Sequence, residues 1–242
     1  MSVLELLKDD NEYYKGVGKN YLSNSNIGTL LNNPRDFGMV QEDNKNFLFG
    51  RYFHQLILEP EKAKDVPYVD VKSRLTKAYK EYVAENNIDI ALLKTEKESA
   101  EYLVKTMTGN FDFYERIYDN GNQFEVPAIG EIEGAMWKGK ADIVGKDYLY
   151  DLKTSGDINR FRYKVRDYNY DSQAFIYQKL FGKPLVFLVI DKSTAMMGMY
   201  PVSEESLERG RQKVIQAVEV YNKFYGENPT EDINQYFFYE EV

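Results

Sequence analysis

Two aspartates and a lysine stand at a spacing that could support metal-dependent hydrolysis. Asp142 lies near the end of one apolar stretch, and Asp151 and Lys153 lie in the next, with a Gly-Lys-Asp turn signal at residues 145–147 between them. The pattern predicts two short strands joined by a tight turn. Because side chains two residues apart in a strand point the same way, Asp151 and Lys153 are expected to share one face.

These residue types suit chemistry on phosphates. Carboxylate oxygens are the ligands that Mg²⁺ prefers, and one or two of them commonly hold the ion together with substrate phosphates and waters. A lysine beside such a site can orient or help to deprotonate the attacking water. The competing interpretation is a solvent-exposed hairpin with a surface ion pair. Short motifs recur by chance, so the rest of the chain has to decide between the two.

The only histidine, His54, lies in an apolar segment at residues 46–58. This segment is predicted to form a helix that stops before Pro60. A neutral imidazole can bind a metal ion. A lone histidine on an apolar helix face is also a common hydrogen-bonded core residue, so both interpretations stay open at this point.

Composition restricts the class of protein. The chain has 242 residues, 43% of them hydrophobic, which suits one generous domain with a sizeable core. It contains no cysteine, which excludes disulfides, thiol catalysis, cysteine zinc sites and iron–sulfur clusters. The N-terminus lacks a signal-peptide core and no apolar run approaches a membrane span. We therefore expect a soluble cytoplasmic protein that makes no membrane contact.

The charge distribution is uneven. The formal net charge of −8 argues mildly against a general nucleic-acid binder. Residues 153–183, however, carry seven lysines and arginines against three aspartates, directly after the candidate site. Positive charge at this place would attract the phosphates of a substrate, and we expect it to line the path of DNA. The cations of this segment that we expect to contact DNA are Arg160, Arg162 and Lys164.

Two earlier segments offer further phosphate contacts. Residues 21–33 predict a Ser/Asn cap and a short helix, and Ser25 near its start would suit a phosphate, although a cap needs no function. Residues 72–86 predict a charged amphipathic helix whose Arg74 and Lys77 could line a DNA channel or simply face solvent. A second amphipathic helix is predicted at residues 95–108, as scaffold.

The hydrophobic period changes to two near residue 123. It predicts strands at residues 123–128 and 132–144, the second containing Trp137 as a core residue. Glu125 is interpreted as an outer acid of the site or, more simply, as a surface strand residue. After Thr154 the chain is expected to be basic and irregular.

A helix is predicted at residues 171–182, capped by Asp171 and closed by Gly182. Gln173 and Tyr177 are four residues apart and would share one face of it. Strands at residues 185–190 and 196–202 follow, and Ser203 begins a long helix that ends near Tyr225.

This order of elements fits an α/β (α+β) fold with a central mixed β-sheet flanked by helices. We expect one domain over residues 1–242. Residues 1–120 would be mainly helical, residues 121–225 would hold the catalytic sheet and its helices, and residues 226–242 would form a tail.

Several motifs together resemble one family. The Gly139-Lys-Ala-Asp142 and Asp151-Leu-Lys153 stretches resemble the PD-(D/E)XK nuclease signature, whose restriction-endonuclease-like core is a mixed sheet of this kind. Gln173-x-x-x-Tyr177 is similar to a helix motif of the RecB-like branch. The segment from Phe49 to Pro60 is similar to the G-x-x-x-H-x-x-x-L-E-P segment of RecE-type (exodeoxyribonuclease VIII) enzymes. Residues 22–27 and 73–81 also match, so five matches stand in the family's order.

The resemblance implies a role for each matched residue. The metal ligands would be His54, Asp142, Asp151 and the backbone carbonyl of Leu152. Lys153 would position and activate the attacking water. Gln173 and Tyr177 would steady the site and the scissile phosphate, and Ser25 would contact a 5′-terminal phosphate. Ala141 stands where the family's first motif has proline, and the cysteine cluster of the iron–sulfur subgroup is absent.

The resemblance also implies an activity. Such enzymes digest one strand of duplex DNA from its 5′ end with Mg²⁺, for which Mn²⁺ is a plausible substitute given His54. Many are phage or prophage proteins that work with a single-strand annealing protein in recombination, and many form homo-oligomeric rings, here a trimer or tetramer. The alternatives are an endonuclease or single-strand-specific nuclease on the same core, and a non-catalytic DNA- or protein-binding module.

Overall fold

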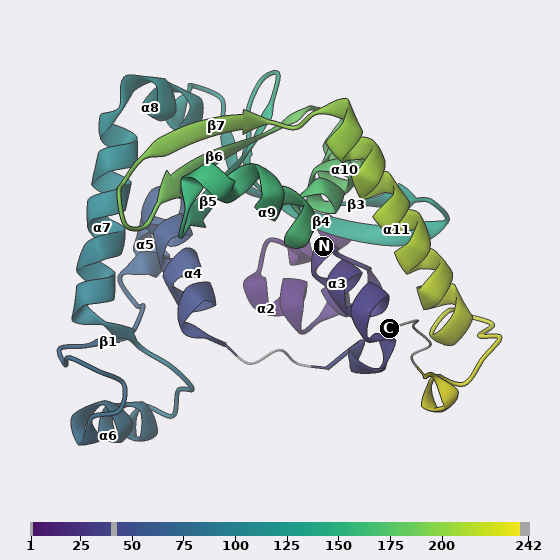
Figure 1. The fold of residues 1–242 in the computed structure, drawn as a ribbon, viewed down its shortest axis with the longest axis horizontal. Helices are drawn as coiled ribbons and strands as arrows, with labels where there is room; N and C mark the ends of the chain where they lie inside the picture. Colours follow the sequence, from purple (N-terminus) through teal and green to yellow (C-terminus); the bar gives the residue numbers. More distant parts are fainter. Residues whose placement is uncertain (1, 40–42, 238–242) are drawn as a thin grey trace.

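A mixed β-sheet runs through the centre of the molecule (Figure 1). The computed structural model describes residues 2–39 and 43–237, so the end of the expected tail, residues 238–242, lies outside it. The strands, in spatial order, are β3 (Gln123–Ile132), β4 (Ala135–Val144), β5 (Leu149–Ser155), β6 (Leu185–Asp191) and β7 (Met197–Pro201). The β5–β6 pair is parallel and the other neighbours are antiparallel, which confirms the predicted mixed sheet.

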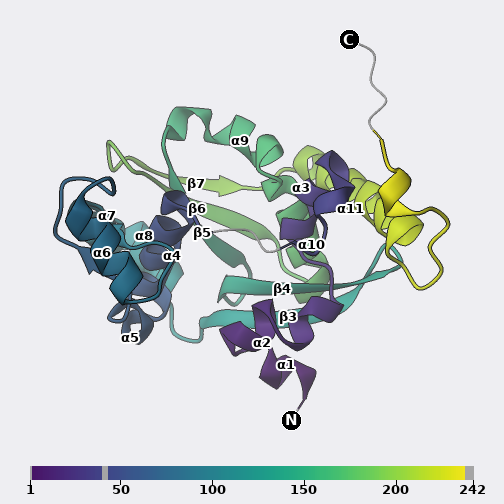
Figure 2. The same cartoon turned by 90° about the horizontal axis from the view of Figure 1, so that it is seen from below.

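Helices cover both faces of the sheet (Figures 1 and 2). One core cluster joins the sheet to α4 (Lys45–Leu58), α7 (Lys94–Gly109) and α8 (Phe111–Tyr118). The other joins it to α3 (Asn24–Asn32), α9 (Phe161–Asp167), α10 (Tyr170–Phe181) and α11 (Glu204–Phe224). All seven residues of β6 are buried, and the six apolar ones alternate between the two clusters, as expected for a central strand covered on both faces.

The remaining elements extend these layers. The N-terminal α1 (Val3–Leu6), α2 (Asp10–Tyr14) and η1 (Val17–Asn20) lie against β3 and β4 (Figure 2). α5 (Pro60–Ala63) packs beside α4, and α6 (Lys77–Glu85) lies past the end of α7 (Figure 1). The short strands β1 (Tyr68–Val69) and β2 (Leu92–Leu93) pair with each other in parallel. The short η2 (Pro34–Asp36), η3 (Ile158–Arg160) and η4 (Ile233–Gln235) complete the set. Across the described ranges, no helix is long and apolar enough to cross a membrane.

The turn of the first hairpin lies later in the chain than the sequence pattern indicated, because β3 runs on to Ile132. β3 and β4 keep one register from Gln123↔Val144 to Ile132↔Ala135, with no ladder pair at Glu125 and Asp142, and Glu133 and Gly134 form the turn. Both turn residues have positive φ, of 50° and 82°, as two-residue hairpin turns require. The predicted strand over residues 132–144 was therefore wrong at its start, because Glu-Gly is a weaker turn signal than Asn-Gly or Asp-Gly.

The second hairpin agrees with the prediction and has an unusual feature. β4 ends at Val144 and β5 begins at Leu149, and the Gly145 N–H donates to the Tyr148 carbonyl at 2.9 Å across the turn. Only two pairs join these strands, Ile143↔Tyr150 and Val144↔Leu149. Beyond them β4 and β5 diverge, and Asp142 stands at the fork.

Two predicted segments differ in the structure. The helix expected over residues 72–86 is α6 and begins only at Lys77, because the side chains of Ser73 and Thr76 hydrogen-bond to main-chain groups in a turn. The stretch after Thr154, expected to be irregular, contains η3 and α9. Phe161 and Val165 anchor α9 in the core, four residues apart on one face.

Asp171 does not cap its helix. α10 begins at Tyr170 after Asn169, and the Asp171 side chain is fully buried. Its carboxylate accepts from Arg209 and Lys213 of α11, each at 2.9 Å. A buried carboxylate needs such partners, and this one joins α10 to α11. Gly182 closes α10 as predicted, with φ of 67°.

The close contact between α10 and α11 requires a glycine at position 210, because a side chain there would clash with the main chain of α10. A Cβ there would lie 2.2 Å from the Asp171 carbonyl oxygen, so Gly210→Ala should lower the free energy of unfolding by about 1–3 kcal/mol. Gly109 is the matched control, since no heavy atom lies within 4 Å of its ideal Cβ and Gly109→Ala should be neutral or gain up to about 1 kcal/mol. Urea unfolding measures both. Equal effects of the two substitutions would contradict this packing.

Candidate active site

Asp142 is held at the fork between β4 and β5. Its Oδ2 accepts the backbone N–H of Leu152 at 2.8 Å, just past the last ladder pair. The side chain therefore replaces a main-chain acceptor that β4 no longer supplies. This fixes the carboxylate where the strands separate.

His54 reaches the same point from α4. Its Nδ1 lies 3.3 Å from Asp142 Oδ2, and its Nε2 lies 2.7 Å from the Leu152 carbonyl oxygen. Leu152 itself is fully buried in the core beneath α4, which leaves its carbonyl at the fork. Three of the four ligands that the resemblance implies thus contact one another directly.

Asp151 and Lys153 face α10 and Tyr170 from the centre of β5. Asp151 is buried, its Oδ2 accepts from Gln173 Nε2 at 2.6 Å, and its Oδ1 is in close contact with the Lys153 ammonium. The Lys153 ammonium also lies 4.7 Å from the centre of the Tyr170 ring. Burial alone would lower the pKa of Lys153, but the negative charge of Asp151 outweighs it and raises that pKa. Lys153 is therefore held as an ammonium.

Tyr177 forms a hydrogen bond to the main chain of β4. Its hydroxyl donates to the Lys140 carbonyl at 2.9 Å, and burial raises its pKa well above the ordinary value, so it remains a neutral donor. A Cβ at Gly139 would lie 2.8 Å from the Tyr177 ring, so the glycine permits this close approach. Gln173 and Tyr177 share a helix face, as predicted, and they orient Asp151 and β4.

Glu125 is the site residue that the sequence reasoning undervalued. One ligand atom each of His54, Glu125 and Asp142 lie within 4.8 Å of one another. Glu125 is partly buried, with φ of 51°, at the β3 position facing Asp142. A turn at residues 133–134 sets Glu125 opposite Asp142 across the hairpin, but Glu-Gly is too weak a turn signal to have fixed this register from the sequence. The simpler interpretation as a surface residue was wrong.

The site carries excess negative charge. Burial, opposed by His54 and reinforced by Asp151, raises the pKa of Asp142 to about 6. Burial and the negative charge of Asp142 raise the pKa of Glu125 to about 8. Carboxylates that crowd together in this way fit a divalent cation, and carboxylate, carbonyl and imidazole donors are suitable ligands. The residues present therefore fit a divalent-metal site.

The predicted DNA-contact residues occupy separate places. Arg160 and Arg162 are exposed, whereas Lys164 of α9 donates to Ser155 Oγ, at the end of β5, at 3.0 Å. Ser25 is exposed at the start of α3. Lys77 is exposed on α6, beyond α7 (Figure 1).

Arg74 differs from its expected exposure. Its side chain is only 23% exposed, and its guanidinium forms hydrogen bonds to both carboxylate oxygens of Glu96, at 2.5 and 2.8 Å. A bidentate pair of this kind uses the donors that would otherwise meet a phosphate. The expectation that Arg74 is exposed was therefore wrong.

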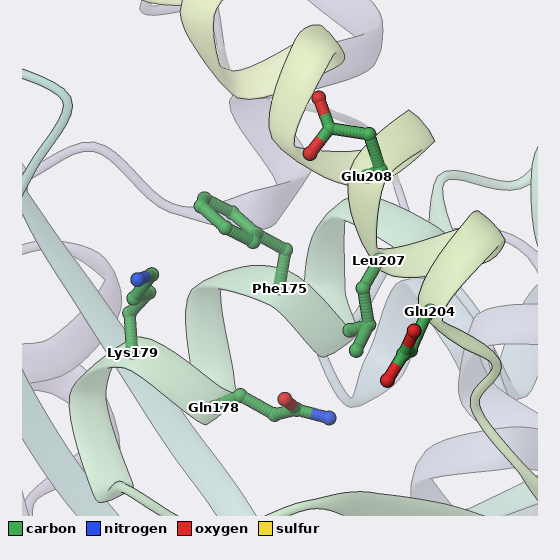
Figure 3. A pocket seen from close by; sticks show the side chains of 6 residues that line it. All are labelled: Phe175, Gln178, Lys179, Glu204, Leu207 and Glu208. Carbon is green, nitrogen blue, oxygen red and sulfur yellow. The ribbon is translucent and has the colours of Figure 1, made fainter.

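A pocket between α10 and α11 lies away from this chemistry (Figure 3). It is lined by Phe175, Gln178, Lys179, Glu204, Leu207 and Glu208. Phe175 is two residues from both Gln173 and Tyr177, so it points to the other side of α10. The two glutamates also make this pocket a poor place for a phosphate.

The raised carboxyl pKa values predict a pH dependence of stability. Both pKa values lie above those of the unfolded chain, so the stability they contribute is present below about pH 4 and is lost as pH rises through about 6 and about 8. When the pH rises from 5 to 8, the free energy of unfolding of the metal-free wild type should fall further than that of metal-free Glu125→Gln. The difference should be on the order of 1–3 kcal/mol. Urea unfolding in EDTA at the two pH values measures the difference, and equal losses would refute it.

The comparisons with known proteins agree with this geometry. The family model described as "PDDEXK-like domain of unknown function (DUF3799)" matches residues 32–230. A crystal structure of a "putative exonuclease" from Eubacterium rectale is similar, with a TM-score of 0.66 and 19% identity over 97% of this chain and 95% of that chain. The structure of SSO0001 aligns with a TM-score of only 0.34 at 16% identity, over 82% of this chain and 85% of that chain. No match was found among curated proteins.

The family match covers most of the chain, and the similar crystal structure has the same fold. The D-x-K strand, the fork aspartate and the mixed sheet are the features that the sequence had indicated. This chain belongs to the PDDEXK-like domain family and is a member of the PD-(D/E)XK nuclease superfamily.

Proposed function

We propose that this protein is a divalent-metal-dependent exodeoxyribonuclease that hydrolyses double-stranded DNA from its ends in the 5′→3′ direction. The observation that carries the proposal is the meeting of His54, Asp142 and the Leu152 carbonyl at the fork, beside the Asp151–Lys153 pair. This donor set suits phosphodiester hydrolysis. Family membership supports a nuclease, and the similar Eubacterium rectale protein is described as a "putative exonuclease".

The cation would be held by His54, Asp142, Asp151 and the Leu152 carbonyl. When bound, a divalent ion neutralises phosphate oxygens, makes a nucleophile available near neutral pH and stabilises the leaving oxygen. Mg²⁺ is the ion we propose, with Mn²⁺ as a working substitute because imidazole is among the donors.

The chain's own groups prepare the reaction around that ion. Lys153, held as an ammonium, would orient the attacking water and offset the charge that builds on the phosphate. Gln173 keeps Asp151 in one orientation, and Tyr177 fixes β4 through the Lys140 carbonyl. Both are positioning residues.

We base the proposed path of the DNA on the segments around the fork. Leu22 forms main-chain hydrogen bonds to β4 at Met136 and Lys138, and this brings the start of α3 beside the sheet. Asn24 Nδ2 donates to the Asn169 carbonyl at 3.0 Å, which joins the start of α3 to the segment between α9 and α10. The groups we propose to contact the DNA backbone there are Ser25, Arg160, Arg162 and Lys164.

Other parts of the proposal rest on the family resemblance. They are the 5′→3′ polarity, the preference for a 5′ phosphate, a homo-oligomeric ring (trimer or tetramer) around the DNA, and a single-strand annealing protein as partner in recombination. The proposal that Lys77 contacts DNA, farther from the fork, also rests on the family resemblance.

The exonuclease proposal predicts a dependence on DNA ends. With Mg²⁺, a linear duplex carrying 5′ phosphates should be digested to mononucleotides from the 5′ termini. A closed circular duplex of the same sequence should stay intact, because it offers no terminus. End-labelled substrates resolved on denaturing gels measure both rate and polarity. Cleavage of intact circles would contradict the exonuclease proposal and would indicate an endonuclease.

The catalytic assignment predicts a separation of cleavage from binding. Asp151→Asn keeps the size of the side chain but removes the charge, so the cleavage rate should fall at least about 10³-fold while binding to duplex ends changes little. Asp147→Asn in the exposed β4–β5 turn is the matched control and should behave as the wild type. Cleavage assays and fluorescence anisotropy measure the two properties. Robust Mg²⁺-dependent digestion by Asp151→Asn would show that the assigned site is wrong.

A further inference from the structure

We propose that Glu125 is an additional protein ligand of the metal centre, placed on the β3 side of Asp142. The inference rests on the metal dependence in the proposed function and deepens it. The PD-(D/E)XK pattern draws its carboxylates from β4 and β5, and Glu125 would add one from the preceding strand. Because β4 lies between β3 and β5, Asp142 has Glu125 on one side and the Asp151–Leu152 segment on the other.

The geometry is close to that of a ligand set. The donor atoms of His54, Glu125 and Asp142 all lie within 4.8 Å of one another. Oxygen ligands about 2.1 Å from an octahedral Mg²⁺ stand about 3–4 Å apart. A small inward movement of one side chain would therefore bring all three donors onto one ion.

Within the described part of the chain, residues 2–39 and 43–237, the Glu125 carboxylate has no hydrogen-bond or ion-pair partner. The charged groups with the largest electrostatic effect on the Glu125 carboxylate are Asp142, Glu59, Lys140 and Asp10, three of which are acidic. Lys140, the only cation of that group, already pairs with Asp10 at 2.7 Å.

A partly buried carboxylate without a partner, beside a second carboxylate and an imidazole, is an unfavourable arrangement unless a cation joins them. A surface role does not explain it, because Glu125 points toward the fork and not away from it. A cation there would also relieve the repulsion between Glu125 and Asp142. We therefore assign Glu125 to the ligand set.

The test is a measurement of Mn²⁺ binding by the full chain without DNA, by isothermal titration calorimetry. Glu125→Gln removes the charge at constant size and should weaken Mn²⁺ binding at least about tenfold. Glu131→Gln, on an exposed position of the same strand, is the matched control and should bind as the wild type. An affinity for Glu125→Gln within twofold of the wild type overturns the inference.

A shorter carboxylate separates a ligand from a general charge effect. Glu125→Asp keeps the charge but withdraws the oxygens by one methylene, so a true ligand should lose several-fold in Mn²⁺ affinity. Unchanged affinity in Glu125→Asp would mean that the charge alone matters and would overturn the assignment. Thermal melting in EDTA checks folding, and Glu125→Gln should melt no lower than the wild type because it removes a repulsion. If Glu125→Gln does not fold, Glu125→Asp decides the question.

The failures of the two proposals are distinguishable. Glu125-dependent Mn²⁺ binding in a wild-type protein that cleaves no DNA leaves the inference standing and removes the proposed function. If the wild type cleaves DNA and neither Glu125 substitution changes Mn²⁺ binding, the proposed function stands and the inference about Glu125 is overturned. A wild-type protein that binds no Mn²⁺ overturns the inference.

Discussion

The hydrogen bond from the Leu152 N–H to Asp142 Oδ2 is the contact on which the rest of the site depends. It closes the β4–β5 ladder with a side chain instead of a carbonyl, and the two strands diverge from that point. The divergence leaves the Leu152 carbonyl free to meet His54. A regular ladder here would use the same main-chain groups within the sheet and would leave no place for a substrate.

Packing on both faces of the sheet holds this fork in place. α4 carries His54 on one face, and its apolar residues share a core with Leu152 and Ile143. α10 carries Gln173 and Tyr177 on the other face and is joined to α11 through the buried Asp171. Each functional side chain therefore stands on an element whose opposite side is buried, which keeps its position defined.

The electrostatics of the site differ from those of the whole chain. The protein is acidic overall, yet Arg160, Arg162 and Lys164 follow directly after β5. At the fork itself Asp142 lies beside Glu125 and His54, and the neighbouring Asp151 pairs with the Lys153 ammonium. Local negative charge attracts a divalent cation, and the adjacent positive charge favours a polyanion; a nuclease needs both within a short distance.

The sequence by itself determined much of this protein. The period-two stretches, the Gly-Lys-Asp turn and the glycine after α10 identified β4, β5 and α10, because these signals are local. The spacing of Asp142, Asp151 and Lys153 identified the nuclease signature, since two-residue alternation fixes which strand residues share a face. The helix bearing His54 was also correct, because its apolar run and Pro60 fix both of its ends.

The tertiary structure decided what depends on contacts between distant residues. Asp171 looked like a helix cap, because aspartate favours that position, but its partners Arg209 and Lys213 lie on α11. Arg74 looked exposed because its partner Glu96 belongs to another helix. Glu125 looked like a surface residue because its position follows from the β3–β4 register, which one weak turn at residues 133–134 sets. Local propensity carries no information about a partner far along the chain, and so only the folded chain could place these three side chains.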